Sequence, residues 1–61
     1  MVLLTLAALE QRPTLPARPR VYVVVGLHQA AAAILEADRY PVESVLVWPE
    51  AARWLREQLL I

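Results

Sequence analysis

The chain has 61 residues, with six basic and six acidic side chains and a formal net charge of zero. This length allows one small domain, residues 1–61, and a neutral chain has no general attraction for nucleic acid or for an anionic membrane. The absence of cysteine and the single histidine exclude disulfides, thiolate metal sites and a multi-histidine zinc site within one chain. We therefore expect no metal and no cofactor.

The apolar fraction is high, at 59% of residues, whereas ordinary globular domains have about 45–50%. A chain of this size buries only about 60% of the surface that its unfolded form exposes. Contiguous apolar surface that stays exposed usually marks an interface. We therefore expect a homo-oligomer, most often a dimer, with another protein as the alternative partner.

Residues 1–11 form an apolar opening segment. Val2, Leu4 and Leu6 would share one face of a strand, but the residues that follow them are good helix formers. We predict a strand over residues 2–7, with a helix as the close alternative. The segment is too short to span a bilayer and no basic residue precedes it, which favours a soluble, cytoplasmic protein without a membrane partner.

Residues 12–20 form a linker rich in proline and arginine, with a proline at every third position. Each proline removes a backbone donor and favours an extended predecessor, so we expect a semi-rigid, extended connection. The arginines of this linker are the candidate nucleic-acid-binding residues: Arg12, Arg18 and Arg20. They would serve in a small DNA-binding regulator of the antitoxin or ribbon-helix-helix type, in which the strand after Arg20 enters a groove.

Residues 21–61 are predicted to form a β-α-β-α unit. The run at 21–25 is almost entirely β-branched and predicts a strand covered on both faces. A helix over 28–39, a second strand over 42–48 and a last helix over 50–60 follow it. Because two strands joined by such a helix are parallel, the expected fold class is α/β: a small two- or three-stranded sheet with a parallel β-α-β unit and a C-terminal helix, completed by oligomerisation.

The apolar pattern also predicts which side chains face inward. In the first of these helices one face carries Leu27, Ala30, Ala31, Ile34 and Leu35. In the second strand Val42, Ser44, Leu46 and Trp48 would share a face. We expect the two helices to cover one face of the sheet, and a second copy to share a core with the chain through the open sheet face, the alanine-rich helix, or both. The candidate interface residues are Tyr22, Val24, Ala30, Ala31, Ile34, Trp48, Trp54, Leu55 and Leu59.

The best candidate for a ligand site is the point where a strand ends and a helix begins, at Gly26, His28 and Gln29. Strand carboxyl ends and helix amino termini are where α/β sheets hold ligands and anions. A single glycine is not a phosphate-binding loop, however, and an ordinary turn is the simpler interpretation. No catalytic residues can be assigned, because the only serine, Ser44, lies mid-strand with no neighbouring base.

These observations favour a homo-oligomeric structural or interaction module that is not an enzyme. The alternatives are the small DNA-binding regulator and an enzyme or ligand-binding protein with an intersubunit site near His28. The absence of asparagine and the prolines in connecting segments are compatible with a thermophilic source.

Overall fold

The computed structural model describes residues 1–60 and contains one parallel sheet of three strands in the order β1-β2-β3. The strands are β1 (Val2–Leu4), β2 (Val21–Val25) and β3 (Val42–Val47), and β2 pairs with both neighbours. The helices are α1 (Leu6–Glu10), α2 (Ala30–Ala37), which follows a 3₁₀ turn at Leu27–Gln29, and α3 (Glu50–Leu59). The predicted α/β class, with a parallel β-α-β unit and a C-terminal helix, is confirmed.

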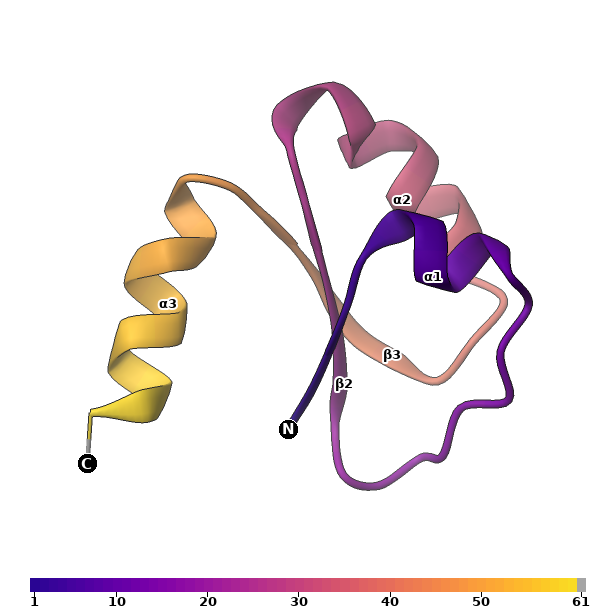
Figure 1. Ribbon diagram of the computed structural model, residues 1–61, viewed down its shortest axis with the longest axis horizontal. Helices are drawn as coiled ribbons and strands as arrows, with labels where there is room; N and C mark the ends of the chain where they lie inside the picture. Colours follow the sequence, from indigo (N-terminus) through magenta and orange to yellow (C-terminus); the bar gives the residue numbers. More distant parts are fainter. Residues whose placement is uncertain (61) are drawn as a thin grey trace.

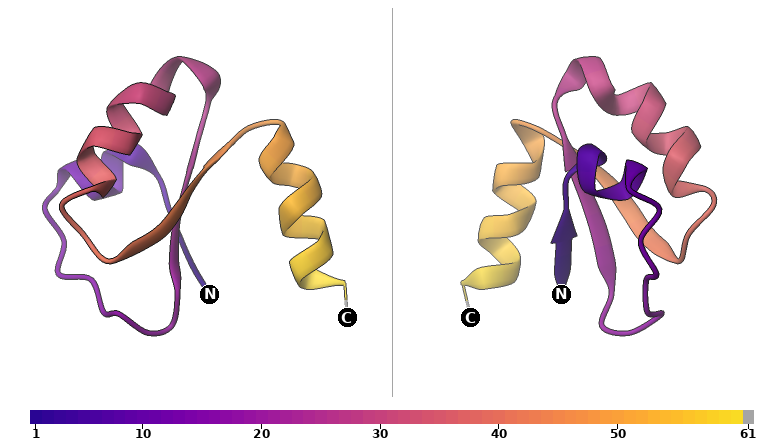
Figure 2. Two further views of the ribbon diagram at one scale, coloured as in Figure 1. Left: turned by 180° about the vertical axis from the view of Figure 1, so that it is seen from behind. Right: turned by 45° about the vertical axis from the view of Figure 1, so that its right-hand side comes forward.

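The helices cover both faces of the sheet. Helices α1 and α2 lie on one face and α3 lies alone on the other (Figures 1 and 2). The aromatic rings of Tyr22 on β2 and Trp54 on α3 have centroids 4.6 Å apart and are tilted by 54°, so α3 is anchored to the face that we had expected a second copy to cover. None of the helices within residues 1–60 has both the length and the apolar character needed to cross a bilayer.

The opening segment contains both a strand and a helix. The strand ends at Leu4, and the Oγ1 atom of Thr5 accepts a hydrogen bond of 3.1 Å from the backbone N–H of Ala8. Because this bond satisfies one of the free donors at the start of α1, the helix begins where the predicted strand over residues 2–7 was to continue. After α1 the chain leaves the helix at Arg12, whose φ of 56° lies in the left-handed region.

Helix α2 faces the sheet with a side that shares only Ala30 with the predicted inward face. Ala33 and Ala37 are buried, whereas Ile34 is 58% exposed and Leu35 is 74% exposed. Leucines from α1 already fill the space above β2, so α2 approaches the sheet through methyl-sized side chains. The buried cluster between these helices and the sheet consists of Leu6, Leu9, Val23, Val25, Ala33 and Ala37.

The pairing of β3 contains an irregularity that changes one predicted face. Val21 pairs with Val42, but the next pair along β2 is Tyr22 with Ser44, so Glu43 has no partner. An extra residue of this kind reverses the alternation of side chains along a strand. Val42 therefore packs against the core with Val45 and Val47, and not on the face of Ser44 as predicted.

The orientation of α2 can be tested with two alanines that are adjacent in the sequence. We expect Ala33→Leu to lower the free energy of unfolding by about 1–3 kcal/mol, because the added atoms must enter a filled core. The control is Ala32→Leu on the exposed side of α2, which should change it by no more than about 0.5 kcal/mol. Urea denaturation measures both, and equal effects would contradict this orientation.

Candidate functional site

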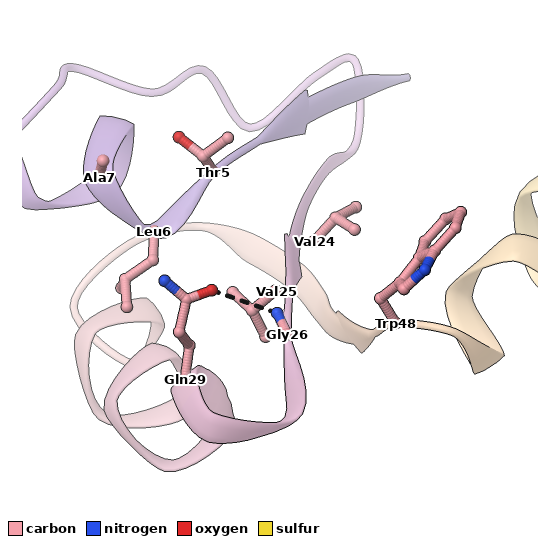
Figure 3. Close-up of a pocket in the computed structure, with 8 residues that line it drawn as sticks. All are labelled: Thr5, Leu6, Ala7, Val24, Val25, Gly26, Gln29 and Trp48. Atoms are coloured by element: carbon pink, nitrogen blue, oxygen red, sulfur yellow. Dashed lines mark hydrogen bonds between the residues drawn. The ribbon is translucent and has the colours of Figure 1, made fainter.

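The carboxyl ends of the three strands meet at one edge of the sheet, where a depression of about 430 Å³ lies between the turns that follow them (Figure 3). We call it the carboxyl-edge depression. Parallel sheets of α/β proteins commonly place ligands at this edge. The lining residues come from all three strand ends and the segments after them: Thr5, Leu6, Ala7, Val24, Val25, Gly26, Gln29 and Trp48.

Two polar side chains line this depression, and each is held by a bond to the backbone. The Oε1 atom of Gln29 accepts a hydrogen bond of 3.2 Å from the N–H of Gly26 (Figure 3). The hydroxyl oxygen of Thr5 accepts the bond from Ala8 that begins α1. The structure thus brings together two of the three residues predicted for a ligand site, Gly26 and Gln29. His28 is exposed and lies outside the lining of the depression.

The depression has few means of catalysis. None of its eight lining residues is an acid, a base or a cysteine. Ser44 is exposed on β3 and lies outside this lining. Among the described residues, no group of three or more histidine, cysteine, aspartate or glutamate side chains is placed to hold a metal ion.

The candidate nucleic-acid-binding arginines lie on the linker, where Arg12, Arg18 and Arg20 are all exposed. The linker enters β2 at the amino-terminal edge of the sheet, opposite the carboxyl-edge depression. Both sides of β2 are already paired, with β1 and with β3. It therefore has no free edge with which to form the two-stranded ribbon of a ribbon-helix-helix dimer.

A second surface lies along the open side of β3. A depression of about 420 Å³ there is lined by Leu27, by Val45–Val47 and by the first residues of α3. Leu27 continues into an exposed stripe on α2 through Ala31, Ile34 and Leu35 at helical spacing. We define the β3-side surface as this stripe together with residues 45–47. It combines an unpaired strand edge with apolar side chains.

The open edge of β3 also presents backbone donors. The N–H of Trp48 donates a hydrogen bond of 2.8 Å to the carbonyl of Val25, so it points toward β2. Successive N–H groups of a strand point to opposite sides. The N–H groups of Val45 and Val47 therefore point away from β2, toward the open edge.

The predicted interface residues occupy several different places. Ala31 and Ile34 lie on the β3-side surface, and Ala30 lies half-buried on α2. Four more are buried or half-buried: Tyr22, Val24, Trp54 and Leu55. The last two are exposed outside the β3-side surface, Trp48 at the carboxyl edge of the sheet and Leu59 near the end of α3.

Sequence reasoning did not assign Leu27, Leu35, Val45 and Val47 to an outer surface. The helical spacing of the apolar residues placed Leu27 and Leu35 on the inward face. The alternative inward face consists only of alanines, which are smaller and less apolar. The signal that could have revealed them is the run of four alanines, which offers two possible inward faces.

Comparisons with known proteins add no further assignment. The chain matches no protein-family model, and no curated protein and no solved structure shows a significant similarity to it.

The role of Thr5 in starting α1 can be tested by substitution. We expect Thr5→Ala to lower the free energy of unfolding by about 0.5–2 kcal/mol, because it removes the acceptor for the Ala8 amide. Thr5→Asp supplies a carboxylate acceptor at the same position and should retain most of the stability. Thermal denaturation followed by circular dichroism measures both, and an unchanged Thr5→Ala variant would show that the cap is unimportant.

Proposed function

We propose that this protein is a non-catalytic interaction module that forms a homodimer, with a second copy of the chain bound to the β3-side surface. The supporting observation is an excess of exposed area. The single chain exposes 4686 Å², whereas a compact monomer of its mass, 6.9 kDa, exposes about 4,000 Å². The difference, about 700 Å², is close to the roughly 800 Å² that each partner buries in a standard interface.

The edge of β3 favours a strand-to-strand contact. A two-fold axis perpendicular to the sheet would set β3 antiparallel to β3 of the partner subunit and produce one sheet of six strands. The amides of Val45 and Val47 would then gain carbonyl partners. An isologous contact of this kind closes on itself, so it also protects the edge from open-ended association.

Helix α2 fits the same symmetry. It packs against both β2 and β3, so it lies above the space between these strands. With strands about 4.8 Å apart, the two α2 axes would lie about 10 Å apart across the dimer, within the usual range for packed helices. Leu27 and Leu35 are each four residues from Ala31, so a two-fold axis at Ala31 sets Leu27 against Leu35 of the partner subunit.

The dimer can be tested with two leucines of equal exposure. Leu35 and Leu59 are both 74% exposed in the single chain, but only Leu35 belongs to the β3-side surface. We expect Leu35→Arg to convert the dimer to a monomer, because it buries an unpaired charge at the helix contact. Leu59→Arg should remain a dimer. Sedimentation equilibrium at micromolar concentration measures both masses.

Amide hydrogen exchange provides a second test of the proposed β3–β3 contact. The amides of Val45 and Val47 should be protected in the wild-type protein and should exchange faster in Leu35→Arg at equal concentration. The amide of Trp48, which bonds within the chain, should stay protected in both. A wild-type monomer at high micromolar concentration, or a dimer dissociated by Leu59→Arg alone, would contradict the proposal.

A further inference from the structure

We propose that the linker of residues 12–20 is a recognition segment for a protein domain that binds proline-rich chains in a groove lined with aromatic rings. This activity goes beyond dimer formation, because none of these residues belongs to the β3-side surface. The linker has the sequence Arg-Pro-Thr-Leu-Pro-Ala-Arg-Pro-Arg. Within it Pro13, Pro16 and Arg18 form the pattern Pro-x-x-Pro-x-Arg, in which two prolines three residues apart are followed by a cation.

The backbone of the linker takes no part in the hydrogen bonding that builds the rest of the fold. Residues 12–20 lie in neither a helix nor a strand, and no backbone–backbone hydrogen bond of the described chain involves residues 13–19. A polyproline II helix has no internal hydrogen bonds, and proline-rich segments are bound in this conformation. The linker can therefore enter a groove without breaking a backbone hydrogen bond.

The packing of Leu15 decides which side of the linker is presented. Leu15 is half-buried against the core, but its neighbours Thr14, Pro16 and Ala17 are exposed. With three residues per turn, an inward Leu15 turns the two other edges of a polyproline II helix outward. One outward edge carries Pro13 and Pro16. The other carries Thr14 and Ala17, whose small side chains leave the ring of Pro16 accessible to a flat aromatic partner.

The linker is held in place before a partner binds. At one end the N–H of Arg12 donates a hydrogen bond of 3.2 Å to the carbonyl of Leu9, and at the other the carbonyl of Arg20 accepts one of 2.8 Å from the N–H of Val2. Between these points the linker runs along the outside of the molecule from α1 to β2 (Figure 1). A segment fixed in this way loses less conformational freedom on binding than a free chain does.

Arg18 adds a charge to the recognised surface. A continuous polyproline II helix would set Arg18 on the edge of Leu15, but the backbone bends at residues 17–19 and Arg18 is exposed. The one ion pair within residues 1–60 joins Arg39 and Glu36, so Arg18 is available to an acidic side chain beside the aromatic groove of the partner. A nucleic acid, in contrast, would use the linker arginines alike and would make no use of the prolines.

The test uses an SH3 domain that binds Pro-x-x-Pro-x-Arg ligands, because its groove combines aromatic rings with neighbouring acids. The domain is titrated into the isotope-labelled protein, and backbone amide shifts are recorded. We expect binding with a dissociation constant of about 100 μM or below. The shifts should centre on Thr14, Leu15, Ala17 and Arg18.

Variants separate the motif from general charge and from the dimer. Pro16→Ala removes a ring and Arg18→Glu reverses the charge of the motif, so each should weaken binding by about fivefold or more. Arg20→Glu makes the same charge change outside the motif and should alter binding by no more than about twofold. Leu35→Arg should bind the domain as the wild type does, so failure of the dimer and failure of this site are distinguishable.

Three results would overturn the inference, with each variant folded as judged by its amide spectrum. The first is the absence of linker shifts at millimolar domain. The second is equal weakening by Arg18→Glu and Arg20→Glu, which would show that charge alone attracts the domain. The third is a salt-sensitive complex with a DNA duplex in place of the domain, which would favour the DNA-binding regulator.

Discussion

The width of the sheet is the constraint on which the rest of this structure depends. The sheet has only three strands, and the shortest extent of the molecule is 14 Å. Two of the three strands are therefore edge strands. The short β1 forms one edge and the longer β3 forms the other. Both faces of the sheet are covered by the chain's own helices, and the exposed side chains Leu27, Ile34 and Leu35 adjoin the open edge of β3. Self-association is therefore proposed at the edge of β3 and along α2, whereas the sequence suggested the open sheet face, the alanine-rich helix, or both.

Much of the fold could be predicted because its strands are strongly β-branched and its turns contain proline. The predicted strand at 21–25 has the observed bounds, and the strand at 42–48 and the helix at 50–60 each differ from those observed by one residue at the carboxyl end. The inward face of α2 could not be predicted. Its alanines permit two orientations, and the choice depends on leucines of α1 that are distant in sequence.

The candidate site was predicted in part. Gly26 and Gln29 follow a recognisable strand end, and the turn between them is local, so sequence position was sufficient to find them. Trp48 and Thr5 reach the same depression from other strands, and their meeting depends on the parallel order β1-β2-β3. His28 was included because of its chemistry, but the 3₁₀ turn leaves it in solvent.

The central position of β2 has a consequence for how the chain folds. This strand completes the crossover unit of residues 2–25 and begins that of residues 21–47, so the two units share one element. If β2 leaves the sheet, both β1 and β3 lose the strand with which they pair. A disturbance of β2 therefore affects both units at once, which favours cooperative unfolding of the sheet.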